Sequence, residues 1–270
     1  MSEYLLAAWS GFALPVVFAI FIWWFSTGVV ILLDGLPHRT FRWSLVISSG
    51  LALAALFGLA HTASQTTLSG AYCAFTCSLL LWGWHELSFL TGWITGPRKR
   101  ANSPGGSRWH HAWQAVQVIL WHELWLLLSM SLIAALTWRQ PNSVGLWTFA
   151  VLWSMRASAK LNLFLGVRNL GLEFLPAHLS YLQHYFRRAR MNLLFPISVT
   201  AASAVAIWMI RGAMSQPAGS AESVGPLLVA TMLVMGVLEH WMLVLPIAPS
   251  ALWRWALRPT HGAVVESALR

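Results

Sequence analysis

Residues 11–33 read GFALPVVFAIFIWWFSTGVVILL, twenty-three residues without one charged side chain. A helix needs about 20 apolar residues to cross the ~30 Å hydrocarbon core of a bilayer. The rest of the chain has the same character, since 57% of its 270 residues are hydrophobic and 9% are charged, against about 25% charged in soluble domains. The sequence therefore predicts an all-α, polytopic membrane helix bundle.

Six further apolar stretches resemble the first, and together they predict about seven transmembrane helices in a single integral-membrane domain, residues 1–270. The predicted spans are 11–33, 43–61, 68–95, 112–137, 144–166, 192–211 and 225–247. The 18 tryptophans suit membrane interfaces and helix contacts. The net charge of +9 follows from topology, so we expect the membrane as a partner and no nucleic acid.

Charge alternates sharply between the connecting segments. The cations gather in every second connection: Arg39 and Arg42; Arg98, Lys99, Arg100 and Arg108; Arg168, Arg187, Arg188 and Arg190; Arg254, Arg258 and Arg270. The positive-inside rule places these segments in the cytoplasm. The N-terminus is then outside and the C-terminus inside, which requires an odd number of spans and agrees with seven.

The longest cytoplasmic connection, residues 167–191, contains a helix signal. Pro176 suits the first turn of a helix, and Leu179, Leu182 and Phe186 follow at three- and four-residue spacing. This pattern predicts a short interfacial helix on the cytoplasmic membrane surface. We expect His178, within this segment, to be solvated.

Three adjacent pairs of histidine and glutamate stand inside the apolar stretches. They are His85-Glu86, His122-Glu123 and Glu239-His240. An isolated charge at the bilayer centre costs about 3 kcal/mol on insertion scales, so such groups need a partner. Counting ~1.5 Å of helix rise per residue from the predicted cytoplasmic ends puts the three pairs roughly 17–21 Å deep. We therefore expect them to share one layer near the membrane middle, with Glu239 closer to the cytoplasmic edge if Pro246 and Pro249 end the last helix early.

Four interpretations of these pairs stay open. The first is structural, because Arg156 and Lys160 share a face of the fifth span and can form ion pairs with the glutamates. The second is a metal site, since histidine and carboxylate from several helices are ligands in di-iron bundles. The candidate ligands are His85, Glu86, His122, Glu123, Glu239 and His240. Neither Glu-x-x-His nor His-Glu-x-x-His spacing occurs among them, so no catalytic residue is assigned. The third is ligation of a tetrapyrrole magnesium by His85, His122 or His240, and the fourth is a proton relay.

Several stretches, spread over nearly the whole chain, resemble the photosynthetic complex assembly protein PuhE family of purple phototrophic bacteria. They are Trp23 to Gly28 leading to Leu33-Asp34-Gly35-Leu36-Pro37; Trp82 to Phe89; Arg156 to Asn162; Asn169 to Pro176; Met191 to Pro196; and Leu238-Glu239-His240-Trp241. The resemblance implies a multi-pass protein of the bacterial inner membrane, cytoplasmic or intracytoplasmic. It brings no family-wide catalytic residues with it.

The resemblance also implies a function. The protein would act as an assembly factor for the photosynthetic reaction centre–light-harvesting core complex, with a role in handling bacteriochlorophyll or modulating its supply. Our own expectation is that it does so without catalysis. Core-complex subunits or other assembly proteins would be its partners, and bacteriochlorophyll or a transition metal its candidate cofactor. The alternative is a metal-dependent membrane oxidoreductase or hydroxylase that uses the intramembrane His/Glu residues on a pigment or lipid precursor.

Overall fold

The computed structural model describes residues 2–102, 107–247 and 249–257, with the backbone alone for residues 2–10; Arg258 and Arg270 lie outside these ranges. Seven long α-helices make up most of the described chain. They are α1 (Ser2–Asp34), α2 (His38–Thr62), α3 (Leu68–Leu90), α4 (Arg108–Leu136), α5 (Val144–Leu165), α6 (Leu194–Met214) and α7 (Ala221–Val244). Short 3-10 helices follow at η1 (Leu172–Phe174), η2 (Ala177–Tyr185) and η3 (Pro249–Trp253). The predicted all-α membrane bundle is confirmed.

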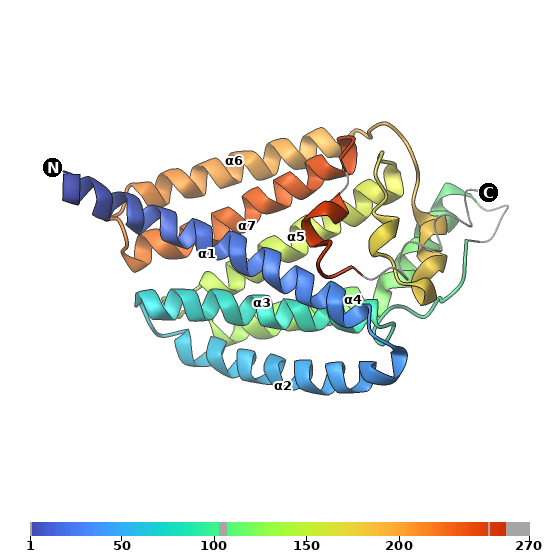
Figure 1. The fold of residues 1–270 in the computed structure, drawn as a ribbon, viewed down its shortest axis with the longest axis horizontal. Helices are drawn as coiled ribbons and strands as arrows, with labels where there is room; N and C mark the ends of the chain where they lie inside the picture. The colour runs from blue at the N-terminus through green and yellow to red at the C-terminus, as the bar shows by residue number, and fades with distance from the viewer. Residues whose placement is uncertain (1, 103–106, 248, 258–270) are drawn as a thin grey trace.

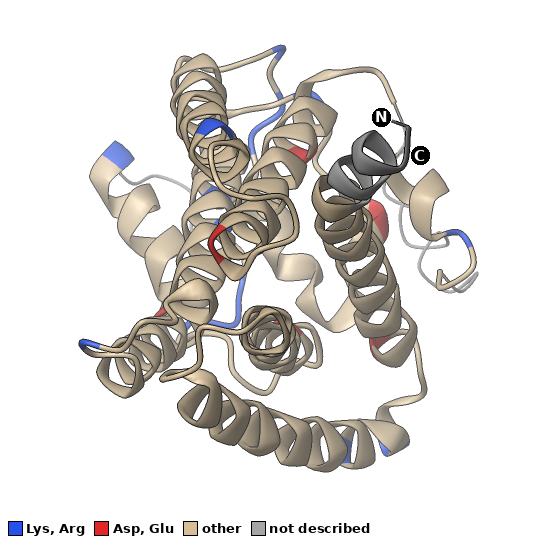
Figure 2. Ribbon diagram, turned by 90° about the vertical axis from the view of Figure 1, so that its left-hand side faces the viewer, with Lys and Arg blue, Asp and Glu red and all other residues tan. Residues whose placement is uncertain are grey.

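The seven helices run back and forth along one direction, so their connections gather at two ends of the bundle (Figure 1). The connections after α1, α3 and α5 lie at the right-hand end, whereas η3 turns back and lies beside α1. Most of the cations lie in these connections or in the first turns of the helices that follow them, and in Figure 2 the blue segments lie mainly on loops and helix ends. The alternation of charge along the sequence thus corresponds to a separation of charge between the two ends.

Five helices meet criteria of length and apolar composition for a membrane span, namely α2, α4, α6, α7 and the part of α1 from Gly11 to Asp34. The other two long helices, α3 and α5, are the ones that carry Glu86, Arg156 and Lys160. These charged side chains lower the hydropathy of the two helices, although both lie among the other helices of the bundle (Figure 1). Crossing of the membrane by all seven helices, and the direction of crossing, stay predictions.

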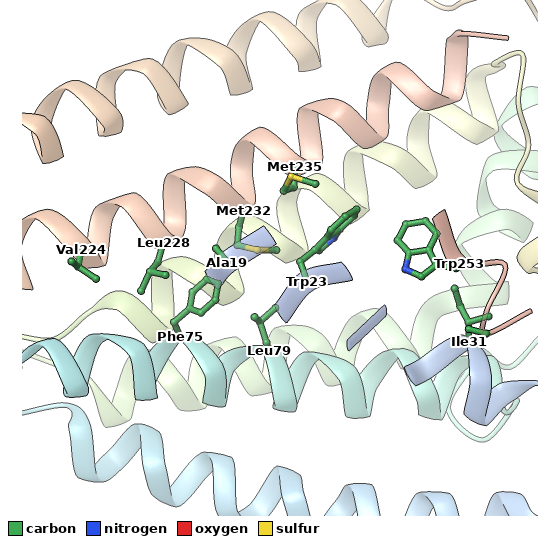
Figure 3. Packing of buried hydrophobic residues seen from close by; sticks show 11 residues of the cluster. Ala19, Trp23, Ile31, Phe75, Leu79, Val224, Leu228, Met232, Met235 and Trp253 are labelled. Atoms are coloured by element: carbon green, nitrogen blue, oxygen red, sulfur yellow. The ribbon is translucent and has the colours of Figure 1, made fainter. Parts of the chain in front are cut away.

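The largest buried apolar cluster lies where α1, α3 and α7 meet (Figure 3). Phe75 and Leu228 are completely buried there, and Met232 is 2% exposed. Trp23 extends the cluster from α1, and Trp253 of η3 joins it from the C-terminal side. Small residues allow close packing nearby, since a Cβ added to Gly236 of α7 would lie 2.8 Å from a side-chain carbon of Met155.

The segment predicted to form an interfacial helix packs against the bundle, and its position on the membrane surface stays a prediction. Its helix, η2, begins after Pro176 as expected but has 3-10 geometry over Ala177–Tyr185. Leu179 and Leu182 are buried in one cluster with Phe89 of α3 and Val118 of α4. The apolar spacing was therefore interpreted correctly as a helix face, but that face meets the protein and not lipid.

Candidate functional site

Two ion pairs join α5 to α3 and α4. The Arg156 guanidinium donates from Nη2 to Glu86 Oε2 of α3 over 3.1 Å. One turn later, Lys160 Nζ donates to Glu123 Oε1 of α4 over 2.5 Å. Arg156 and Lys160 share a helix face because they are four residues apart. That face therefore links α3 and α4 through charge-assisted hydrogen bonds.

The third glutamate has a different partner. Trp23 of α1 donates its indole Nε1–H to Glu239 Oε1 over 3.1 Å. Glu239 also interacts electrostatically with Arg156. Three carboxylates from α3, α4 and α7 thus meet two cations from α5, and full ionisation of all five would leave one negative charge. We call these five side chains, Glu86, Glu123, Arg156, Lys160 and Glu239, the charged cluster.

The charged cluster lies closer to one end of the bundle than the sequence suggested. Helix α3 ends at Leu90, four residues after Glu86, whereas the predicted span continued to residue 95. Helix α7 ends at Val244, five residues after Glu239. At ~1.5 Å per residue these carboxylates are only about 6–8 Å from the ends of their helices. The three glutamates meet the same two cations of α5, with those of α3 and α7 near the ends predicted to be cytoplasmic and Glu123 fifteen residues into α4.

The three histidines point to different surroundings from the glutamates beside them. His85 Nε2 lies 2.8 Å from Ser129 Oγ of α4. His240 donates from Nδ1 to the carbonyl of Gly236 over 2.8 Å, and its Nε2 lies 2.9 Å from Ser158 Oγ. His122 differs from both, because neither ring nitrogen has a hydrogen-bond partner and the residue is 1% exposed.

The six candidate ligands therefore divide into separate groups. The rings of His85 and His122 are neighbours, with centroids 6.4 Å apart, while His240 bonds toward α5. Within the described ranges, no three His, Cys, Asp or Glu side chains come together in a way that could hold a metal ion. Metal binding by this set stays a prediction, and it would require the side chains to rearrange.

A large pigment also fits poorly at the imidazoles as they are packed. His85, His122 and His240 are each 1% exposed, and both ring nitrogens of His240 already have partners. His122 has uncommitted nitrogens, but Phe89 packs against its ring at a centroid distance of 4.7 Å. A tetrapyrrole ring could reach these nitrogens only after the helices separated.

Several residues beside the charged cluster were not identified from the sequence. Ser129 and Ser158 supply the hydroxyls next to His85 and His240, and Ser198 of α6 lies 2.9 Å from Ser158. Trp23 supplies the bond to Glu239. Serines inside apolar helices are a weak signal, because they commonly bond to their own helix, so only the arrangement of helices identifies these partners.

The C-terminal segment is attached to α1 next to Trp23. Trp24 donates its indole N–H to the carbonyl of Leu252, and Trp253 donates its own to the carbonyl of Trp24, both over 2.9 Å. The Trp23 and Trp253 rings are in edge-on contact, with centroids 5.4 Å apart. Gly28 leaves room for Trp255, since an added Cβ would lie 2.1 Å from its ring. This aromatic contact covers the helix that carries the Glu239 partner.

The fold and the charged cluster define a class: a polytopic helical membrane protein whose intramembrane charges are compensated between helices. Within that class, the chain belongs to the DUF3623 family, described as "Protein of unknown function (DUF3623)", whose model matches residues 9–263. A Rhodobacter capsulatus protein described as "Uncharacterized 30.4 kDa protein in puhA 5'region" is 39% identical over 243 residues, which cover 88% of each chain. No solved structure matches the chain.

Proposed function

We propose that this protein is an assembly factor for the photosynthetic reaction centre–light-harvesting core complex, acting in the bacterial inner membrane. The observation that carries the proposal is the relative in the puhA region, a photosynthesis gene cluster. Its identity of 39% extends over 88% of both chains, so the similarity is not confined to one motif. The motifs from Trp23 to Trp241 that resemble the PuhE family support the same assignment.

The charged cluster supports a non-catalytic role. In this proposal its five side chains hold α3, α4, α5 and α7 in register, because each ion would be costly in lipid without its partner. The bond from Trp23 adds α1 to the same layer. A rigid interior of this kind leaves the outer helix faces to contact core-complex subunits or other assembly proteins.

The metal-dependent oxidoreductase or hydroxylase has less support. Two of its proposed ligands, Glu86 and Glu123, are engaged by Arg156 and Lys160. A role in bacteriochlorophyll supply is part of the proposal, but it does not depend on ligation by His85, His122 or His240. Any pigment contact would more readily use the exterior of the bundle, where Trp121 and Trp125 of α4 are 49% and 45% exposed.

Gene replacement tests the proposal in the organism of the relative. The gene for the 39% identical protein is deleted in Rhodobacter capsulatus, and the amount of core complex is measured in isolated membranes by absorption spectroscopy and native gels. We expect a clear loss of core complex, which expression of this chain restores. Unchanged core complex in the deletion strain would refute the proposal.

A second measurement in the same strains separates assembly from catalysis. Pigment extracts are analysed by chromatography before and after deletion. Loss of core complex with an unchanged set of pigment intermediates is the expected result for an assembly factor. Accumulation of a single pigment precursor, relieved by this chain but not by its His122→Ala variant, would favour the enzyme.

A further inference from the structure

The loop between α3 and α4 is fixed firmly to the side of α4. Gly92, with φ of +77°, turns the chain after α3. Farther along, the Thr95 carbonyl accepts a hydrogen bond from the backbone N–H of His122 over 2.9 Å. At Gly96 the two backbones are so close that an added Cβ would lie 2.0 Å from the carbonyl oxygen of Gln117. The position of this loop is therefore set by backbone contact as well as by side chains.

Tyr185 of η2 fixes the next part of the loop. Arg98 donates from Nε to the Tyr185 hydroxyl over 2.8 Å, and that hydroxyl donates to the carbonyl of Arg100 over 3.1 Å. Tyr185 is 8% exposed. Three consecutive cations, Arg98, Lys99 and Arg100, are thereby held on a rigid backbone, and the last two are exposed to the surroundings.

These cations surround a hollow of about 400 Å³. Its lining consists of Pro97, Arg98, Lys99, Arg100 and Gln117. The volume lies in the range of small-molecule sites, roughly 300–1,000 Å³. Among the described residues, no acidic side chain contributes to the lining. A Lys ammonium, Arg guanidinium groups and a Gln amide are the donors that bind phosphate oxygens.

The hollow is flanked by exposed tryptophans, which suit a position at the bilayer interface. Trp113 and Trp121 are exposed on α4 one turn to either side of Gln117, and Trp93 on the loop is 66% exposed. Exposed tryptophans are enriched where hydrocarbon meets headgroups. The cations place this end of the bundle on the predicted cytoplasmic side, where basic pockets between helices bind anionic headgroups.

We propose that this hollow is a binding site for the phosphate headgroup of an anionic membrane lipid. Lys99 and Arg100 would bind the phosphate oxygens, Gln117 would donate to the headgroup, and the acyl chains would lie along α4 beside Trp121. A free phosphate compound shares the same phosphate chemistry, but the exposed tryptophans favour the lipid as its source. The site does not depend on the assembly function proposed above.

Native mass spectrometry of the full-length protein in detergent tests the site with defined lipids. The protein is titrated with phosphatidylglycerol or with phosphatidylcholine, and retained lipids are counted. We expect one phosphatidylglycerol to be retained preferentially. The double variant Lys99→Gln/Arg100→Gln should weaken its binding by roughly 30-fold, the effect of two cations near an anionic surface.

A matched variant separates the site from general charge. Arg39→Gln/Arg42→Gln removes two exposed cations from α2 on the same predicted side and should bind the lipid as the unmodified protein does. Melting temperatures from tryptophan fluorescence show whether both double variants are folded. If Lys99→Gln/Arg100→Gln does not fold, the single variants Lys99→Gln and Arg100→Gln are used, and each should show a smaller loss of phosphatidylglycerol binding.

Three outcomes would overturn the proposal. The first is equal retention of phosphatidylcholine. The second is equal loss of phosphatidylglycerol in the two double variants. The third is displacement of the lipid by millimolar inorganic phosphate, which would identify a soluble phosphate site instead of a lipid site.

Discussion

Removal of Lys160 probes the charged cluster most informatively. Lys160→Met keeps most of the length of the side chain but leaves Glu123 of α4 without the ammonium that lies 2.5 Å from its carboxylate. The two side chains are 18% and 23% exposed, so water screens the pair only in part. Loss of one partner of a buried pair costs roughly 3–5 kcal/mol. Because some exposure remains, we expect the lower value, about 3 kcal/mol of unfolding free energy.

A double-mutant cycle separates the interaction from the other effects of each substitution. Glu123→Gln should also cost about 3 kcal/mol, since it leaves the ammonium unpaired. The double variant Lys160→Met/Glu123→Gln should cost only about 4 kcal/mol, because neither charge then remains without its partner; the coupling is about 2 kcal/mol. The assay is reversible unfolding by sodium dodecyl sulfate from mixed micelles, followed by tryptophan fluorescence and circular dichroism.

A second cycle provides the control for the first. It combines Lys160→Met with Glu222→Gln, because Glu222 is an exposed residue in the first turn of α7. These two changes should add within about 0.5 kcal/mol, as distant sites do. If the unfolding free-energy costs of Lys160→Met and Glu123→Gln are equally additive, the ion pair contributes nothing to the joining of α4 and α5, and the predicted coupling is wrong.

Two further changes test the α3–α4 loop and its neighbour η2. Gly96→Ala puts a Cβ 2.0 Å from the backbone oxygen of Gln117 and should cost about 3 kcal/mol or more of unfolding free energy in the same assay. The control Gly212→Ala, whose added Cβ has nothing within 4 Å, should be neutral or stabilising by up to about 1 kcal/mol. Similar values for both variants would contradict the close backbone contact. Burial lowers the pKa of His178 below its ordinary 6.5. The hydrogen bond to the Leu90 carbonyl raises the pKa, but by less than burial lowers it. The unfolded chain then binds the proton more readily, so this contribution to stability is complete above about pH 6.5 and is lost as the pH falls toward the lower, folded pKa. Unfolding measured at pH 7.5 and 5.5 should therefore show a smaller loss on acidification in His178→Gln than in the unmodified protein, and an unchanged loss would refute this role of His178.

The sequence predicted the helices well because the signal for them is local. Long apolar stretches and alternating cations indicate the spans in nearly the positions that the structure gives. The errors are at helix ends, where α3 stops at Leu90 because Gly92 turns the chain with a positive φ. Helix α7 stops at Val244, two residues before Pro246, which cannot supply the N–H that a continuing helix needs.

The sequence predicted which charged side chains would interact inside the bundle, but not which pairs they would form. The spacing of Arg156 and Lys160 indicates that both face one side of α5, but which glutamate each one reaches depends on the order and rotation of α3 and α4. The same holds for Trp23 and Glu239, which are 216 residues apart in the sequence. His178 was expected to be solvated, yet it bonds to Leu90, because η2 packs against the bundle.

The most direct test of the account is the composition of the intact protein. The tagged chain is purified from membranes of the complemented Rhodobacter capsulatus strain in mild detergent, and its partners, absorption spectrum and metal content are measured together. We predict core-complex subunits or other assembly proteins in the preparation and no stoichiometric transition metal. Stoichiometric iron or zinc that disappears in His122→Ala, without any photosynthetic partner, would contradict the account and favour a metalloenzyme.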